Sequence, residues 1–231
     1  MDRKTLKLIG SVVVSAMAVT ACSETPAESL PTITTLTPTT TSGPASETSS
    51  TTTAPPIVIG EQIEISGNEL PMFEPDNDQA IGLPAPRVEA TSFDGTPVTI
   101  DHDGETYKMI VFLAHWCSHC QEEVPEVRDW LATYDLGDEI EIVSVSTGER
   151  SDRPNWPPKE WLTREQWPVP VIEDSLESDI SMAYGLQAFP YWVFLDKDGS
   201  VLLRANGLSS EALTQIADQI KAFDESLETS S

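Results

Sequence analysis

The sequence predicts an α/β layer fold, in which helices cover both faces of a central mixed β-sheet. Along residues 82–228, apolar runs typical of buried strands alternate with segments whose apolar residues recur at helical spacing. A Cys-x-x-Cys pair, Cys117 and Cys120, directly follows one apolar run and opens the next helical segment. The chain after about residue 56 is long enough for one compact domain with its own core.

The first expected elements are short strands. Residues 57–65 alternate weakly between apolar and polar, which predicts an edge strand, and residues 68–79 predict a loop. Residues 87–91 and 97–101 flank the turn Asp94-Gly95, a pattern typical of a hairpin.

The middle of the domain predicts a strand, a helix and a second strand. Residues 107–114 form the continuous apolar run expected of a central strand, and residues 140–146 predict another buried strand. Between them, residues 118–134 place Val124, Val127, Trp130 and Leu131 at helical spacing. Pro125 is expected to kink this helix because it lacks a backbone N–H.

The last third predicts shorter elements and a final helix, which is capped by Ser209 and carries Leu213, Ile216, Ala217 and Ile220 on its inner face. In order, we expect a short helix within 157–167, a short strand over 169–172, a helix over 178–184 that ends at Gly185, a hairpin over 191–195 and 201–205, and a helix over 210–227.

The Cys-x-x-Cys pair indicates thiol–disulfide exchange. Thiols at positions i and i+3 of a first helical turn lie on one side of it, close enough to form a Cys117–Cys120 disulfide. Free backbone N–H groups and the helix dipole favour a thiolate on the first cysteine. We therefore expect Cys117 to be the exposed, attacking thiolate and Cys120, one turn deeper, to resolve the mixed disulfide. The pair itself is the redox group, and we expect no other cofactor.

Residues beside the pair are expected to tune it. A partly protonated His119 would stabilise the Cys117 thiolate, and the plainer interpretation is an exposed histidine with a small effect. Glu123 lies three residues after Cys120, and a raised pKa would let it exchange a proton with that thiol. The alternative is an ordinary acid in a first helical turn. Trp116 is expected to shield the thiols and shape the substrate-contact surface.

The third cysteine lies at the end of a predicted export signal. A basic start is followed by an apolar stretch from Leu8 to Val19, which is too short for a comfortable membrane span. Val19-Thr20-Ala21-Cys22 resembles the lipobox of bacterial lipoproteins, which implies cleavage of residues 1–21 and lipidation of Cys22. An uncleaved anchor or plain secretion is the alternative.

Residues 22–56 are rich in Thr, Ser and Pro, which predicts a disordered tether between the lipid and the domain. Residues 57–81 are interpreted as an N-terminal extension and residues 82–228 as the folded domain. An exported domain that keeps one reactive pair and no structural disulfide suits a redox catalyst better than a disulfide-stapled scaffold.

The formal net charge is −25, with acids spread across the domain. Phosphates would be repelled by such a surface, which argues against nucleic acid as a partner. A solvated acidic surface is the plain interpretation, and a basic partner is the more specific one.

Several further features resemble the thioredoxin fold, in particular the membrane-tethered TlpA/ResA-like branch of thiol–disulfide oxidoreductases. The resemblance covers about residues 82–227. It rests on Trp116 before the first cysteine, on Pro125 five residues after the second, on the opening Gly82-Leu-Pro84-Ala-Pro86, and on the stretch 184–196, which is similar to the one that carries the family's cis-proline.

The resemblance implies roles for particular residues. It places a cis bond before Pro190, which would face the disulfide and let Phe189 offer its backbone to a substrate strand. Glu123 matches a glutamate of the TlpA/ResA-like branch. In two places the chain departs from the pattern: Val111 stands where thioredoxin has a buried aspartate, and Phe189 is larger than the usual residue before the cis-proline.

Together these patterns predict a lipid-anchored thiol–disulfide oxidoreductase on the extracytoplasmic face of a bacterial membrane, acting on cysteine-containing exported proteins. The resemblance implies that the protein acts as a reductase, for example of apocytochromes in cytochrome c maturation, and that it receives electrons from a donor in the membrane. The dipeptide Ser118-His119 is similar to the Pro-His of DsbA-type oxidants and favours disulfide formation with a membrane acceptor. We favour the reductase because the likeness of the whole domain outweighs one dipeptide.

Metal binding is the alternative of another class. The two thiolates with His115 or His119 would suit Cu(I), but no histidine follows residue 119 to supply a remote ligand. A closed zinc site needs four ligands, and we expect no metal. A peroxidase is disfavoured because no Thr-x-x-Cys pattern surrounds Cys117.

Residues 148–170 contain three tryptophans among five prolines. Two interpretations stay open: a lid or partner-docking insert near the active edge, or tryptophans that cover the flank of the sheet.

Overall fold

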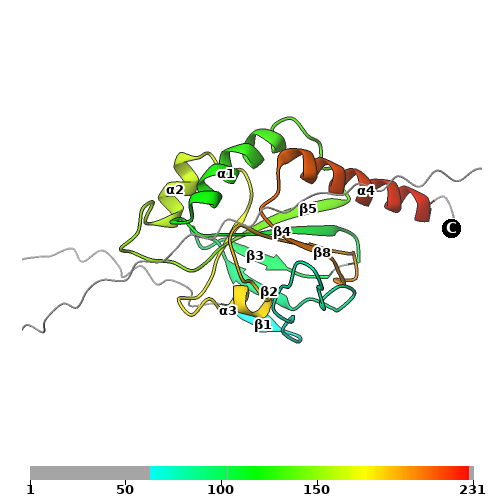
Figure 1. Ribbon diagram of the computed structural model, residues 1–231, viewed down its shortest axis with the longest axis horizontal. Coiled ribbons are helices and arrows are strands. Elements are labelled where there is room, and N and C mark those ends of the chain that lie inside the picture. Colours follow the sequence, from blue (N-terminus) through cyan, green and yellow to red (C-terminus); the bar gives the residue numbers. More distant parts are fainter. Residues whose placement is uncertain (1–62, 103, 229–231) are drawn as a thin grey trace, which may run out of the picture. The chain divides into compact units, whose positions relative to one another are not determined.

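The computed structural model describes residues 63–102 and 104–228. Its centre is a five-stranded mixed sheet in the order β6–β5–β4–β7–β8 (Figure 1). The strands β4 (Tyr107–Leu113), β5 (Ile140–Ser146) and β6 (Val171–Glu173) run parallel to one another. β7 (Tyr191–Leu195) pairs antiparallel with both β4 and β8 (Val201–Asn206). The predicted mixed sheet is confirmed.

Helices cover both faces of this sheet, as predicted. Figure 1 shows α1 (Ser118–Leu131), α2 (Pro158–Arg164) and α4 (Ser210–Glu228) on one side. On the other side lie α3 (Asp179–Ala183) and a separate three-stranded antiparallel sheet. That second sheet consists of β1 (Glu64–Ser66), β2 (Arg87–Thr91) and β3 (Pro97–Ile100).

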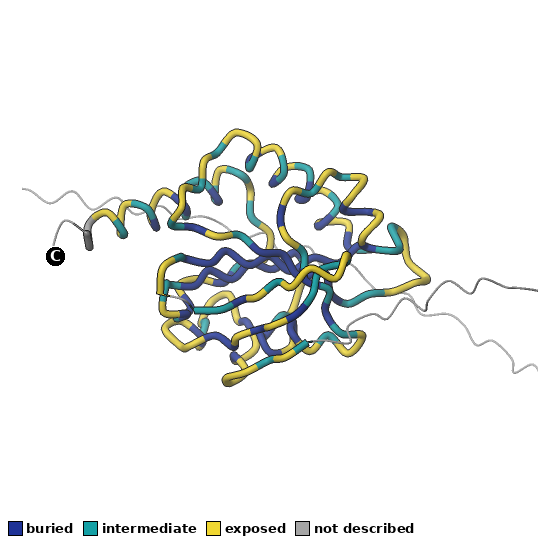
Figure 2. The backbone as a smooth tube through the Cα atoms, turned by 180° about the vertical axis from the view of Figure 1, so that it is seen from behind, coloured by how far each residue is buried: buried dark blue, intermediate teal, exposed yellow. Residues whose placement is uncertain are grey.

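The sheet separates two apolar clusters. One lies under α1, α2 and α4, and the other lies between the sheet, α3 and the small sheet. All seven residues of β4 and all five of β7 are buried, because both faces of these strands are covered. Figure 2 shows this buried centre in dark blue beneath largely exposed outer segments. The continuous apolar run of residues 107–114 reflects this double burial.

Several element boundaries differ from the predicted ones by a single residue, and those of α1 and β6 differ by more. The helix expected over 118–134 ends at Leu131, where the N–H of Tyr134 turns back to the carbonyl of Trp130. The strand expected from Val169 starts at Val171, since Pro170 has no N–H and only its carbonyl pairs with Ser144.

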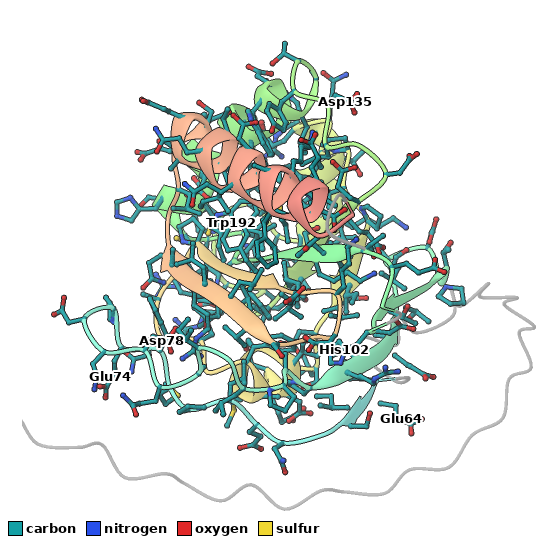
Figure 3. The ribbon with its side chains drawn as sticks, turned by 90° about the vertical axis from the view of Figure 1, so that its right-hand side faces the viewer. Glu64, Glu74, Asp78, His102, Asp135 and Trp192 are labelled. Atoms are coloured by element: carbon teal, nitrogen blue, oxygen red, sulfur yellow. The ribbon has the colours of Figure 1, made fainter. Side chains whose placement is uncertain are left out.

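Residues before Gly82 pack onto the domain. The predicted loop of residues 68–79 contains no helix or strand, yet it buries Leu70 and Phe73 in the core. Figure 3 shows Asp78 beside the domain, where it pairs with the buried guanidinium of Arg204. The signal peptide, the tether and the first part of the predicted edge strand lie outside the described residues. Within the described range, no helix is both long and apolar enough to span a bilayer.

Two of the three tryptophans between β5 and β6 pack against the sheet, and the third packs against His115. Trp161 is buried in the cluster under α1, and the indole N–H of Trp167 donates to Ser144 Oγ at 3.0 Å. The ring of Trp156 meets His115 edge-on at 5.7 Å. These contacts support the packing interpretation of the segment.

Candidate active site

The two cysteines lie at the start of α1, directly after the central strand. Cys117 is the N-cap residue, and the backbone N–H of Cys120 donates to its Sγ at 3.4 Å. The carbonyl oxygen of Phe189, from the loop before β7, lies 3.8 Å from the same sulfur. Both cysteines are free thiols in this structure. The helix N-terminus therefore directs a donor at the sulfur, where it stabilises negative charge.

Cys117 is less exposed than predicted. It keeps 9% of its surface, while Cys120 keeps none, so Cys117 is still the accessible one of the two. The rings of Trp116 and Phe189 pack beside it and meet each other edge to face at 5.8 Å. Burial, assisted by the neighbouring Cys117 and Glu123, raises the pKa of the Cys120 thiol.

Glu123 is buried below the pair. Its Oε1 accepts from the indole N–H of Trp192 at 2.5 Å, and its Oε2 accepts from the backbone N–H of Leu208 at 3.1 Å. Figure 3 shows Trp192 in the interior beneath α4. Burial raises the pKa of Glu123, although the two hydrogen bonds oppose the rise. Glu123 is thus a buried acid whose charge acts on the Cys120 thiol.

His119 lies on the surface, in contrast to Glu123. Its side chain is 77% exposed, and its Nδ1 lies 3.8 Å from a carboxylate oxygen of Glu122. His119 and Glu122 line a groove of about 440 Å³ between α1, the loop before β7 and the segment between β8 and α4. The other lining residues are Glu123, Glu126, Phe189, Pro190, Asn206, Gly207, Leu208 and Ser209.

The bond between Phe189 and Pro190 is cis, as the resemblance implies. Pro190 is buried and Phe189 is half-buried. The structure thus brings Trp116, Cys117, Phe189 and Pro190 together at one edge of the sheet, while His119 lies on the outer wall of the groove.

His115 has a structural position that the sequence did not reveal. It is fully buried, its Nδ1–H donates to the carbonyl of Pro154 at 2.6 Å, and its Nε2 accepts from the backbone N–H of Arg150 at 3.1 Å. Burial lowers its pKa, which favours this neutral form. Both ring nitrogens are therefore engaged with backbone and are not available to a metal.

The loop after β5 contributes residues that sequence reasoning missed. The carbonyl of Gly148 accepts the indole N–H of Trp116 at 2.7 Å, and the guanidinium of Arg150 lies 5.8 Å from the centre of the Trp116 ring. A glycine two residues after a buried strand was the available signal, since Gly148 has a φ of +62°. Across the described part of the chain, no group of three or more His, Cys, Asp or Glu side chains is arranged to hold a metal ion.

Fold and cysteine geometry together define a thioredoxin-like thiol–disulfide oxidoreductase. Residues 81–204, more than half of the chain, match the AhpC/TSA family, and the chain belongs to that family. The predicted enzyme class is thereby confirmed.

Two curated relatives match over shorter stretches. The methylamine utilization protein MauD of Methylobacillus flagellatus is 27% identical over 135 residues, which are 58% of this chain and 60% of that protein. Nucleoredoxin of Mus musculus is 27% identical over 140 residues, which are 60% of this chain and 30% of that protein. The matches thus span less than two thirds of either relative's length.

Solved structures share the fold at low identity. The thioredoxin domain of a thiol-disulfide oxidoreductase from Bacteroides vulgatus has a TM-score of 0.50 at 20% identity, covering 62% of this chain and 99% of that one. StoA from Bacillus subtilis has a TM-score of 0.50 at 18% identity, covering 58% of this chain and 97% of that one.

Proposed function

We propose that this oxidoreductase is an extracytoplasmic, lipid-anchored enzyme that reduces disulfides of other exported proteins through Cys117 and Cys120. The observation that carries the proposal is the position of the Cys117 sulfur. It caps α1, accepts a backbone N–H and lies 3.8 Å from the carbonyl of Phe189 at the cis-proline loop. A substrate strand that pairs with this loop would bring its own sulfur to Cys117.

The exchange proceeds in two displacements. The Cys117 thiolate attacks one sulfur of the substrate disulfide, so that a mixed disulfide forms and the other substrate sulfur leaves as a thiolate, which takes up a proton. The Cys120 thiolate then attacks the Sγ of Cys117 and releases the second substrate sulfur. Two electrons pass to the substrate, and the enzyme is left with a Cys117–Cys120 disulfide.

The second displacement requires a proton acceptor. The buried Cys120 holds its proton tightly, since burial raises its pKa. Glu123 is the acid nearest in sequence that is also buried, and its raised pKa suits reversible proton transfer. We propose that Glu123 takes the proton when Cys120 attacks and returns it when the enzyme is reduced again.

Trp116 and Phe189 are proposed to contact the substrate, because their rings form the rim beside Cys117. His119 is proposed to tune the pair from the groove wall. Its exposed ring beside Glu122 favours a modest effect, because exposed charges are screened by solvent. This exposure supports the reductase over the DsbA-like oxidant.

Membrane attachment and partners follow from the chain outside the described residues. The lipobox-like Val19-Thr20-Ala21-Cys22 supports lipidation of Cys22, and the tether of residues 22–56 would let the domain reach substrates above the membrane. We propose an electron donor in the membrane and exported cysteine-containing proteins, apocytochromes among them, as substrates. A Cu(I) module finds less support, because backbone groups occupy both ring nitrogens of His115.

Single cysteine variants test the assignment. We expect Cys117→Ala to abolish reduction of a peptide disulfide, because no attacking thiolate remains. Cys120→Ala is expected to accumulate a mixed disulfide between Cys117 and the peptide, which mass spectrometry detects as one added peptide. Equal activity of the two variants would contradict the proposed roles.

Whether the enzyme reduces or oxidises its substrates is tested by the reduction potential of the Cys117–Cys120 pair, measured in graded glutathione buffers. A value near −270 mV, roughly that of thioredoxin, supports the reductase, and a value of about −120 mV supports the oxidant.

A further inference from the structure

Glu149 is a titratable group that the exchange chemistry does not use. It lies in the loop after β5, and both of its carboxylate oxygens are buried without a hydrogen-bond partner among the described residues. Burial, together with the charges of Glu173 and Asp174, raises the pKa of Glu149 to about 7. A buried carboxyl without donor or cation is tolerated in its neutral form and is costly when ionised.

The groups that act on Glu149 are the two acids at the end of β6. Burial raises the pKa of Asp174, although three backbone N–H groups in and before α3 donate to its carboxylate and oppose the rise. Burial raises the pKa of the half-buried Glu173, although the charge of Lys159 on α2 opposes the rise. An ionised Glu149 would therefore be repelled from this site as well as desolvated.

The residues on either side of Glu149 support the surroundings of Cys117. The carbonyl of Gly148 accepts the indole N–H of Trp116, and a side chain at position 148 would lie 3.5 Å from the ring of Phe189. The backbone N–H of Arg150 donates to His115 Nε2. A shift of residues 148–150 thus reaches the rim of the active site directly.

We propose that Glu149 is a positioning residue: its neutral side chain, with both carboxyl oxygens buried, seats the Gly148–Arg150 segment against Trp116 and His115, and its ionisation unseats that segment. When the segment moves, the carbonyl of Gly148 no longer holds the indole of Trp116 in place, so that substrate docks less well beside Cys117. This inference rests on the proposed role of Cys117 as the attacking thiolate.

The test measures how fast the reduced full chain reduces a peptide disulfide between about pH 5.5 and about pH 8.5, a range that brackets the pKa of Glu149. Glu149→Gln keeps a neutral side chain of similar shape, and Glu160→Gln makes the same change at an exposed position of α2. Each variant's rate is divided by the wild-type rate at the same pH, which cancels any pH dependence that the two proteins share.

We expect the ratio for Glu149→Gln to be near one at low pH and to rise to about threefold or more at high pH, since small displacements at a docking site cost at least that much rate. The ratio for Glu160→Gln is expected to stay flat. A flat ratio for Glu149→Gln overturns the inference while leaving the role of Cys117 intact.

A second measurement does not depend on activity. The fluorescence of Trp116, obtained by subtracting the spectrum of Trp116→Phe, is expected to change with a midpoint near pH 7 in the wild type and to stay constant in Glu149→Gln. The same pH step in both proteins overturns the inference. Retained peptide reduction in Cys117→Ala would instead contradict the proposed function, and the fluorescence step would still report on Glu149.

Discussion

Neighbouring residues on α1 differ sharply in their surroundings. Glu122 is 79% exposed and Glu123 is buried, because they lie about 100° apart around the helix. Burial gives Glu123 a raised pKa and two specific donors, Trp192 and Leu208. The proton transfer proposed for Glu123 therefore depends on its position on the buried face of α1.

Truncation of Glu123 is expected to destabilise the protein. Glu123→Ala leaves the buried indole N–H of Trp192 and the partly buried backbone N–H of Leu208 without an acceptor, so the free energy of unfolding should fall by about 2 kcal/mol. Urea denaturation at neutral pH measures the loss. Glu122→Ala is the matched control and should change stability by less than about 0.5 kcal/mol. Equal effects of the two variants would argue against the hydrogen bonds as the cause.

Glu149 is expected to make stability fall as pH rises. Its proton dissociates near the ordinary value of 4.5 in the unfolded chain and near 7 in the folded one, so the folded state binds more protons between these values. Stability from this group is complete below about pH 4.5 and is lost as pH approaches 7. Because the side chain is partly exposed, we discount the loss to about 1–2 kcal/mol.

Comparison of Glu149→Gln with the wild type isolates the pH-dependent contribution of Glu149 to stability. The two proteins should have equal free energies of unfolding near pH 4.5, and the variant should be the more stable one at pH 8, as measured by urea denaturation. A difference that does not vary with pH would contradict the assigned titration. Glu160→Gln should follow the wild type throughout.

At the scale of elements, the segment before β2 is attached through a buried ion pair. The side chain of Arg204 on β8 is fully buried, and it donates to Asp78 and to the carbonyls of Pro71 and Tyr184. Burial acts to raise the pKa of Asp78, but the hydrogen bonds and charge of Arg204 lower it overall. The pair thus links an irregular segment to the central sheet.

Loss of Asp78 should be costly. Asp78→Ala leaves the guanidinium of Arg204 buried and uncompensated, for which we expect a loss of about 3–5 kcal/mol in urea denaturation. The exposed pair of Asp152 and Arg153 supplies the control, because Asp152→Ala should cost less than about 1 kcal/mol. A small effect at Asp78 would show that Arg204 finds other acceptors.

At the scale of the whole molecule, the excess of acids governs the response to salt. A net charge of −25 repels itself in the compact state, and salt screens that repulsion. Raising sodium chloride from about 10 mM to about 150 mM should therefore raise the melting temperature by about 3 °C. Calorimetry measures the shift. A lower melting temperature in salt would show that attractive ion pairs outweigh the repulsion.

The order and type of most elements could be predicted from the sequence. The apolar run of β4 and the helical spacing of Val124, Val127 and Trp130 depend on local periodicity, which the printed residues contain. Ends were less predictable: Leu131 ends α1 through a hydrogen-bonded turn, and Val171 starts β6 because pairing with β5 decides it. Two hairpins were predicted correctly, but nothing local showed that the first belongs to a separate sheet.

The sequence by itself determined the α/β class, the reactive pair and its place at a helix N-terminus, because these depend on periodicity and on spacing within one turn. Tertiary structure decided the rest. It buried Glu123 against Trp192, engaged both nitrogens of His115 with loop backbone, and left Glu149 without a donor. The hydrogen-bond partners lie 35 or more positions apart in the chain, and the missing donor at Glu149 depends on how neighbouring segments pack. Only the packed fold specifies either.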